Sequence, residues 1–473
     1  MKKRVIIIGA GEAGKMVSND ILRNKKISDK YEIIGFLDDD KTKDVVNHIP
    51  VLGGLEVVGR ISEQYSADEI IIAIPSADKE LISSIIRNVS DLSINIKIVP
   101  GIYDIIQGDV NWKQIRDVKP EDLLGREEVG IEIDKIKNEY IDKTIFITGA
   151  GGSIGSEIVR HLFKLPIKKL IAFGRGENSI HNLIEEFHYE KRFNYVIGDI
   201  RDASKLNHEI KKCAPDIIFH AAAHKHLPLM EEFPDEAIKN NILGTYNLVT
   251  AAINNKVTKV LIISTDKAVN PSSVMGATKR VAEIIALSYN KFQSTTKFSI
   301  VRFGNVLGSR GIVIPTFKKR IESGGPINLT DPNIERFFMS IPEAARLVLK
   351  SISIKEGSIF ILDMGRSIKI MDLAKNLIKL SGRKEDEIAI RITGLRKGEK
   401  LYEELSYKKE NLTASKFNKI LVANETENLE INKEYIEKML EELKIASNDY
   451  DYSKIKVLLK KYVPEYLYHN NGA

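Results

Sequence analysis

The sequence contains a single cysteine, Cys213, and no apolar run long enough to cross a membrane. One cysteine excludes an internal disulfide framework and a cysteine-rich zinc site, and it fits a reducing compartment; we expect Cys213 to be a buried structural thiol. The opening Met1-Lys2-Lys3-Arg4 leads into only four apolar residues, too few for a signal peptide. We therefore expect a cytoplasmic location, with membrane attachment only if an N-terminal segment has been removed.

The sequence also lacks a block of lysine or arginine. Its 71 basic and 65 acidic residues are spread along the chain and leave a net charge of +6. This pattern does not indicate a nucleic-acid-binding arm, although a phosphate-bearing small ligand could account for part of the excess. With 43% hydrophobic and 29% charged residues over 473 positions, the composition is typical of a folded protein with two or three domains.

A strand, a glycine turn and a helix open the chain. The run Val-Ile-Ile-Ile at 5–8 precedes Gly9-Ala10-Gly11-Glu12-Ala13-Gly14 and a helical pattern, an arrangement that suits a pyrophosphate. With strands expected at 31–37, 69–74 and 94–99, residues 1–120 are predicted to form a Rossmann-like nucleotide-binding domain, followed by a linker at 121–140. Acidic residues at 38–40 could bind the hydroxyls of a ribose. The alternative is a fold that has lost its ligand or binds a regulatory one.

The same pattern restarts near residue 141. A strand at 144–148 is followed by Gly149-Ala-Gly-Gly152-Ser-Ile-Gly155 and a helix, and further strands are expected at 170–173, 195–197, 217–220, 260–264 and 298–302. This is a complete doubly wound set. The fold class predicted is α/β, with two Rossmann-like parallel-sheet domains, the second spanning 141–473 with a smaller substrate-binding lobe at about 305–410 and a helical C-terminal tail.

The second glycine turn and the strand ends beside it predict a dinucleotide site. Thr148-Gly-x-x-Gly-x-x-Gly resembles the fingerprint of extended short-chain dehydrogenases. Arg175 follows a strand where an NAD site would carry an acid; an Arg there can pair with a 2′-phosphate, so NADP is favoured over NAD unless Arg175 is a solvated loop charge. Asp199, at the end of another strand, is placed to accept from the adenine amino group.

The segment after the strand at 260–264 contains the expected chemistry. Thr265-Asp266-Lys267 lies at the carboxyl end of the sheet. Met275 and Lys279 are four residues apart, so they share one helix face, and we expect both to point at the cofactor as part of the catalytic set. A thioether has no proton to exchange, so Met275 cannot be a general base. Either the chain is inactive as an oxidoreductase, or Asp266 and Lys267 handle the protons; the remaining alternative is an exposed ion pair that caps the strand.

From residue 142 to about 465 the sequence resembles the bacterial UDP-N-acetylglucosamine 4,6-dehydratases, the capsular polysaccharide biosynthesis group of extended short-chain dehydrogenases. Longer members of this group carry methionine where others have tyrosine, as at Met275. The resemblance is carried by the runs at 148–155, 220–231, 240–245, 264–271, 275–279, 302–310, 330–332, 336–339 and 394–404. It implies a nicotinamide cofactor that is regenerated in each turnover, a nucleotide-sugar substrate and, as we expect, a homo-oligomer.

The resemblance assigns roles to individual residues. Because elimination needs a base and an acid on adjacent carbons, we hypothesise that Lys267 takes the carbon 5 proton and Asp266 protonates the departing 6-hydroxyl. Thr265 would bind the 4-oxygen and Lys279 the nicotinamide ribose, while the acceptor of the 4-hydroxyl proton stays open. The expected cofactor contacts are Gly149, Gly152, Ser153, Ile154, Gly155, Arg175, Asp199, Ile200, Ala221, Ala222 and Lys279. The expected substrate contacts are His224, Lys225, Asn305, Arg310, Arg336, Arg396 and Glu399.

Three departures from the group's pattern bear on specificity: Arg175 where many long members have an acid, Ile312 where Ser is common, and Lys397 where Pro is usual. A dehydratase that inverts carbon 5, a nucleotide-sugar 4-epimerase and a non-catalytic nucleotide-sugar sensor are the alternatives. No metal site is expected, because the closely spaced His220, His224 and His226 lack a carboxylate partner in any metal motif; packing beside the cofactor is the interpretation preferred.

Overall fold

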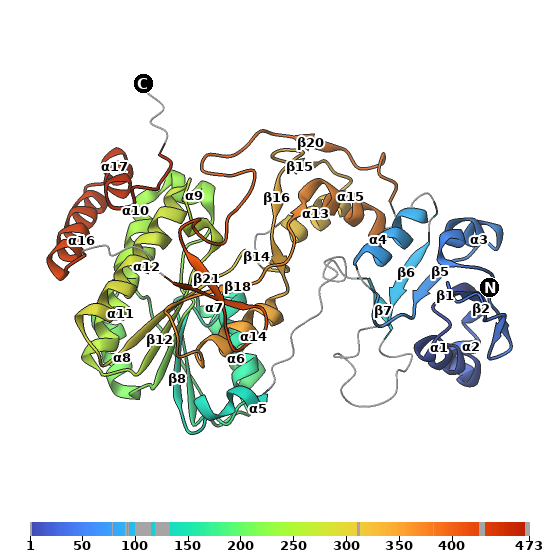
Figure 1. Ribbon diagram of the computed structural model, residues 1–473, viewed down its shortest axis with the longest axis horizontal. Coiled ribbons are helices and arrows are strands. Elements are labelled where there is room, and N and C mark those ends of the chain that lie inside the picture. The colour runs from blue at the N-terminus through green and yellow to red at the C-terminus, as the bar shows by residue number, and fades with distance from the viewer. Residues whose placement is uncertain are drawn as a thin grey trace. The chain divides into compact units, whose positions relative to one another are not determined.

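The computed structural model describes residues 2–77, 79–89, 92, 94–99, 115–118, 133–309, 313–381, 383–424 and 431–468. The chain divides into two compact units (Figure 1). The first contains Met1–Glu128, Gly311–Pro332 and Ile368–Thr393, and the second contains Val129–Arg310, Asn333–Ser367 and Gly394–Ala473. Two segments that the sequence suggested for the substrate lobe thus belong to the first unit. Most of the expected linker lies outside the described residues.

The first unit is built on a five-stranded sheet with the order β2-β1-β5-β6-β7, in which β7 alone is antiparallel to its neighbour. Its opening strand is buried on both faces: Ile6 and Ile8 contribute to one hydrophobic cluster and Val5 and Ile7 to the other. The predicted strands are confirmed. The elements are β1 (Lys3–Ile8), α1 (Glu12–Arg23), α2 (Lys25–Ser28), β2 (Tyr31–Leu37), β3 (Val45–Val46), β4 (Ile49–Pro50), η1 (Leu55–Val57), α3 (Val58–Gln64), β5 (Glu69–Ile72), α4 (Lys79–Asn88), β6 (Asn95–Ile98) and β7 (Arg116–Asp117).

Later parts of the chain complete this first unit. They form α13 (Val313–Glu322), β15 (Ile327–Leu329), β19 (Ile368–Lys369), α15 (Ile370–Leu380) and β20 (Ile390–Ile392), with β15 and β20 paired in parallel. Leu380, the last residue of α15, packs against the cluster that contains Ile82 and Ile85 of α4. This apolar contact explains why α15 joins the unit of the first sheet.

The second unit contains a nine-stranded sheet with the order β10-β9-β8-β11-β12-β13-β18-β22-β21. The seven strands from β10 to β18 are parallel, and β22 and β21 extend the sheet in antiparallel pairing. The predicted doubly wound core is confirmed, and three strands beyond it are added. The strands are β8 (Thr144–Thr148), β9 (Lys169–Gly174), β10 (Phe193–Ile197), β11 (Ile217–His220), β12 (Lys259–Ile263), β13 (Lys297–Arg302), β18 (Ile359–Leu362), β21 (Asn411–Ala414) and β22 (Ile420–Asn424).

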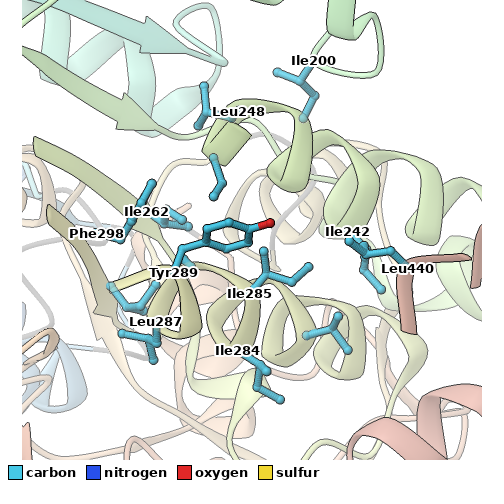
Figure 2. Packing of buried hydrophobic residues seen from close by; sticks show 14 of the residues in the cluster. Ile200, Ile242, Leu248, Ile262, Ile284, Ile285, Leu287, Tyr289, Phe298 and Leu440 are labelled. Carbon is cyan, nitrogen blue, oxygen red and sulfur yellow. The ribbon is translucent and has the colours of Figure 1, made fainter. Parts of the chain in front are cut away.

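Helices cover both faces of this sheet (Figure 1). Successive strand residues point to opposite faces, so Phe146 joins one hydrophobic cluster and Ile145 the other. The first face is covered by α8 (Ala203–Cys213), α11 (Gly244–Asn254) and α12 (Val274–Phe292). The second is covered by α6 (Ser153–Leu162), α7 (Glu177–Phe187) and α14 (Ile341–Ser351). In Figure 2 the Tyr289 ring of α12 lies among Leu248, Ile285 and Phe298.

The C-terminal helices α16 (Lys433–Asn448) and α17 (Tyr452–Tyr462) pack on this first face, as the labelled Leu440 and Ile242 illustrate in Figure 2. The expected helical tail is therefore part of the core cluster.

Cys213 is half-buried rather than buried, which corrects the sequence prediction, because α8 leaves its last turn partly exposed. Burial still raises the pKa of its thiol to about 11. Among the described residues, every helix is too short or too polar to span a membrane.

The remaining elements are α5 (Ile133–Ile136), η5 (Lys137–Glu139), α9 (Leu227–Glu232), α10 (Pro234–Ala237), η6 (Ile238–Leu243), η7 (Asp266–Ala268), β14 (Asn305–Val306), β16 (Glu335–Arg336) and β17 (Phe338–Met339).

Candidate functional site

The turn from β8 to α6 is shaped by glycines. Gly149 has φ of +66°, and a Cβ there would lie 2.6 Å from the backbone nitrogen of Ala222. A Cβ on Gly155 would collide with the carbonyl oxygen of Gly149, so helix and strand approach closely only with glycine at both positions. Gly152 caps α6 without a side-chain hydrogen bond, which suits an anion at the helix N-terminus. The turn therefore fits the pyrophosphate of a dinucleotide, with Ser153 and Ile154 opening the helix.

A cation and an ionised carboxylate lie at the ends of β9 and β10. The half-exposed Arg175 is 3.9 Å from Asp199, which also accepts hydrogen bonds from the backbone and guanidinium of Arg201. Burial opposes ionisation of Asp199, but Arg201 outweighs it and lowers the pKa of the carboxyl. Ile200 is buried in the core cluster shown in Figure 2. The preference for NADP through Arg175 stays a prediction.

The buried His220 of β11 contacts β8 and α11 through its two ring nitrogens. Its Nδ1 lies 2.7 Å from Thr148 Oγ1 and its Nε2 lies 3.1 Å from Thr245 Oγ1. Burial, with the charge of Lys279, lowers the pKa of His220 to about 3, so the ring is neutral at physiological pH. Within the part of the chain that the structure describes, no three His, Cys, Asp or Glu side chains gather in a way that could hold a metal ion.

Asn241 organises the loop after β11, a role that the sequence did not reveal. Its side chain accepts from the backbone N–H of His224, donates to the His224 carbonyl, and donates to Thr278 of α12. It lies in η6, a π-helix, a rare element that is frequent at functional sites. The signal that could have pointed to Asn241 is the pair of adjacent asparagines at 240–241, which lies within one of the segments that carry the family resemblance and is buried in the structure. The loop that contains Ala221, Ala222 and His224 is thereby fixed against α12.

The predicted catalytic pair forms directly after β12. Thr265 Oγ1 donates to Asp266 Oδ1 at 2.8 Å, and Lys267 Nζ donates to the same oxygen at 3.0 Å. Asp266 is fully buried, and its Oδ2 has no hydrogen-bond partner among the described residues. A Cβ on Gly304 would lie 3.2 Å from this Oδ2. The predicted alternative of an exposed ion pair is therefore wrong, because the strand end is covered.

Lys267 has two further neighbours. Its ammonium donates to Asn305 Oδ1 at 3.2 Å and lies 3.7 Å from Glu403 Oε1. Burial favours the neutral amine, but the carboxylates of Asp266 and Glu403 outweigh it and raise the pKa of Lys267. Glu403 was not among the predicted site residues; it lay within the family segment at 394–404, but the sequence shows no partner for it. The centre therefore contains two carboxyls beside one amine.

Lys279 and Met275 lie four residues apart on α12, with different surroundings. Lys279 Nζ donates to the carbonyl of Ile263 at 2.8 Å, at the end of β12, and burial lowers the pKa of its amine to about 8. Met275 is 3% exposed and belongs to the hydrophobic cluster of this face. Met275 thus has a packing role here, and the ribose contact of Lys279 stays a prediction.

The predicted substrate residues are only partly brought together. The guanidinium of Arg336 donates to the carbonyls of Glu335, Lys400 and Leu401, which holds the 400–401 segment beside the centre. Glu399 lies 3.5 Å from Arg336. Lys225 donates to Ser309, Arg396 is exposed, and Arg310 lies outside the described residues. The diphosphate contacts of these side chains stay predictions.

A buried ion network lies behind the catalytic turn. Ser264 donates to Glu283 of α12 at 2.6 Å, and Glu283 accepts a double hydrogen bond from Arg302 of β13 at 2.7 and 2.9 Å. Arg302 also pairs with Glu410, and Arg280 pairs with Glu283. Burial alone would raise the pKa of Glu283, but the arginines hold it at about 2. The network fixes the residue that precedes Thr265.

In the first unit, the glycine turn is bound to its own acidic run. Asp38 Oδ2 accepts from the backbone N–H of Ala10 at 2.6 Å, and the same carboxylate pairs with Lys43. Asp39 accepts from the backbone of Leu55. Asp38, one of the acidic residues expected to bind a ribose, thus supports the glycine turn. Binding of a nucleotide there stays a prediction.

Comparison with known families gives two matches. Residues 145–425 match the family described as polysaccharide biosynthesis protein, and residues 1–100 match a CoA-binding domain family. The chain belongs to the polysaccharide biosynthesis protein family. This family falls within the extended short-chain dehydrogenases, a group that includes nucleotide-sugar dehydratases and epimerases, and the resemblance inferred from the motifs is confirmed.

Individual relatives agree with this placement. The chain is 45% identical over 417 residues to the capsular polysaccharide biosynthesis protein CapD of Staphylococcus aureus, covering 86% of this chain and 69% of that protein. It is 47% identical over 416 residues to the probable polysaccharide biosynthesis protein EpsC of Bacillus subtilis, with the same coverage. A UDP-glucose 4-epimerase of Rickettsia typhi is 38% identical over 273 residues, 56% of this chain and 78% of that protein.

A solved structure supports the fold. Pen from Bacillus thuringiensis is 36% identical to this chain and superposes with a TM-score of 0.57 over 61% of this chain and 89% of that one. The α/β fold class with Rossmann-like domains is therefore confirmed.

Proposed function

We propose that this protein catalyses the 4,6-dehydration of a nucleotide-activated N-acetylhexosamine, with UDP-N-acetylglucosamine as the substrate, for surface-glycan or glycoprotein synthesis. The observation that carries the proposal is the buried Asp266–Lys267 pair, 3.0 Å apart, at the carboxyl end of the parallel sheet. Elimination across two adjacent carbons needs an acid and a base side by side, and this pair supplies both. Simple alcohol oxidation would need only one base.

A nicotinamide cofactor belongs to this proposal. The glycines at 149, 152 and 155 form a turn that suits its pyrophosphate, and the half-exposed Arg175 suits the 2′-phosphate of NADP. When bound, the cofactor would supply the oxidation at carbon 4 and the matching reduction at carbon 6, and it would be regenerated in each turnover. It should therefore copurify with the enzyme.

Proton transfer is assigned to the chain's own residues. Thr265 donates to Asp266 at 2.8 Å, so a 4-hydroxyl bound to Thr265 can pass its proton through the threonine hydroxyl to this carboxylate. Asp266 then holds the proton that the departing 6-hydroxyl needs to leave as water. Lys267, as a neutral amine, takes the carbon 5 proton and later returns it. Met275 takes no part in proton transfer, because a thioether has no exchangeable proton.

Incubation of the purified protein with UDP-N-acetylglucosamine tests this function. Proton NMR should show a 6-methyl doublet and loss of the carbon 4 proton, and mass analysis should show loss of one water. A product that keeps its 6-hydroxyl and differs only at carbon 4 would establish the epimerase, which the Rickettsia relative favours. Tight binding of the nucleotide sugar without turnover would establish the sensor, and inversion at carbon 5 would be seen in the same spectrum.

Two substitutions connect the chemistry to the pair. Asp266→Asn and Lys267→Met should each lower kcat by about a hundredfold to ten-thousandfold, because each removes one member of an acid–base pair, while cofactor binding is retained. Lys291→Met, at an exposed position on the same helix as Lys279, is the matched control and should leave kcat unchanged. Near-wild-type turnover by either site variant would refute these roles.

A further inference from the structure

Glu403 is a buried carboxyl beside the catalytic lysine that the proposed roles do not use. Its side chain is 2% exposed, and its Oε1 lies 3.7 Å from Lys267 Nζ and 3.9 Å from Arg336 Nε. Its Oε2 is buried without a hydrogen-bond partner among the described residues. Burial of a carboxylate oxygen without a partner is costly. This oxygen is therefore well placed to carry a proton.

The charged groups around Glu403 agree with this interpretation. Burial is the largest influence and raises the pKa of Glu403, and the nearby Asp266 acts in the same direction. Lys267, Arg336 and Lys400 act against it, but the pKa stays above its ordinary value. Glu403 thus takes up a proton more readily than an exposed glutamate does.

A count of protons shows why such a group is needed. In the resting site Lys267 is an ammonium ion hydrogen-bonded to Asp266, whereas elimination needs a neutral Lys267 and a protonated Asp266. If Asp266 receives its proton from the 4-hydroxyl, the ammonium proton of Lys267 has to go elsewhere. Among the described residues, the carboxylates within 4.0 Å of Lys267 Nζ are Asp266 and Glu403.

We propose that Glu403 is a positioning residue that stores the proton of Lys267 during elimination and returns it at the end of the reaction. This proposal rests on the proposed dehydration. It explains why a carboxyl with a free oxygen lies within reach of the amine, and it makes preparation of the base independent of solvent.

The protons and bonds balance through the cycle. Carbon 4 is oxidised, for which the proposed nicotinamide cofactor would accept the hydride, while the 4-hydroxyl proton passes to Asp266 and the Lys267 ammonium proton passes to Glu403. Elimination then breaks the C5–H and C6–O bonds: Lys267 takes the carbon 5 proton, and the proton of Asp266 leaves in water. Carbon 6 is reduced by the hydride that the cofactor would return, Lys267 returns its proton to carbon 5, and Glu403 returns its proton to Lys267. Every side chain regains its starting charge.

The test compares wild type, Glu403→Gln and Glu403→Asp across pH. Glutamine has the shape of the side chain but cannot accept the proton, so Lys267 must lose its proton to solvent. At neutral pH Glu403→Gln should lower kcat by about a hundredfold with little change in KM. The lost activity should recover by about tenfold per pH unit towards alkaline pH, as the neutral amine becomes populated. Wild type should show no such rise, and aspartate should restore part of the neutral-pH activity.

A second readout isolates the proton transfer from the rest of the cycle. The 4-keto-6-deoxy product made by wild type is returned to each variant in heavy water, and loss of the carbon 5 proton signal is followed by NMR. Glu403→Gln should slow this exchange at neutral pH, with the same recovery at higher pH. Glu404→Gln, at the partly exposed neighbouring position, is the control and should behave as wild type.

The outcomes separate the two proposals. A loss of activity in Glu403→Gln that is equal at every pH, or a wild-type rate at neutral pH, would overturn the proton store while leaving dehydration intact. A wild-type protein that forms no 6-deoxy product would instead refute the proposed function. Circular dichroism and cofactor content identify a misfolded variant, and in that case Glu403→Asp decides by the same pH profile.

Discussion

At the scale of single residues, the chemistry depends on which charged side chains share the space after β12. The sequence alone placed Asp266 and Lys267 together, because they are adjacent in the chain and follow a predicted strand. It could not place Glu403 beside Lys267, because 136 positions separate them and only the fold brings them within 3.7 Å. Arg336 was predicted as a diphosphate clamp; its donors hold the backbone at 400–401, and the diphosphate contact stays a prediction.

The pH dependence of stability gives a prediction for His220. Burial lowers its pKa from 6.5 to about 3, so in acid the unfolded chain binds a proton that the folded chain rejects. Stability from this group is complete above pH 6.5 and is lost as pH falls from 6.5 towards 3. The contribution should approach about 1.4 kcal/mol per pH unit inside that window.

Chemical denaturation of wild type and His220→Asn at about pH 7 and about pH 5 measures this effect. The variant should be less stable than wild type at neutral pH, but its stability should fall less between the two conditions. His208→Asn is the control and should show the wild-type slope. An unchanged slope in the His220 variant would mean that the ring is not held neutral by the fold.

At the scale of elements, hydrophobic periodicity predicted the parallel strands and the helices between them, because buried β-branched runs and glycine turns are local signals. The antiparallel strands β21 and β22 and the grouping of α15 with the first unit were not predicted. The pairing of β22 with β18 and the packing of Leu380 against the cluster that contains Ile82 and Ile85 join distant segments, which no local pattern records.

The link between α12 and β13 gives a prediction at this scale. Glu283 accepts from Ser264, Arg280 and Arg302 in a buried network, so Glu283→Gln leaves two arginines short of a counter-charge. The free energy of unfolding should fall by about 3 to 5 kcal/mol, measured by urea denaturation. Glu437→Gln, on the surface of α16, is the matched control and should change it by less than about 0.5 kcal/mol. A loss no larger than that of the control would show that the network contributes little to stability.

At the scale of the whole molecule, two α/β units occur in one chain, and the restart of the strand–glycine–helix pattern near residue 141 made this predictable. The charged groups to which we assign the proposed dehydration lie in the second unit, around Asp266 and Lys267. In the first unit the glycine turn is supported by Asp38, and the fully buried Glu69 pairs with Lys97 at 3.0 Å at the start of β5. The proposed dehydration is therefore assigned to the second unit, and the ligand of the first unit stays a prediction.

In the proposed function, oxidation at carbon 4 and reduction at carbon 6 belong to one internal cycle that is driven by elimination. UDP-N-acetylglucosamine carrying deuterium at carbon 4, incubated with the wild-type enzyme and followed by NMR and mass spectrometry, tests it most directly. We predict a 4-keto product whose 6-methyl group contains one deuterium. A methyl group without deuterium, or a product that keeps both its 6-hydroxyl and the deuterium at carbon 4, would contradict it.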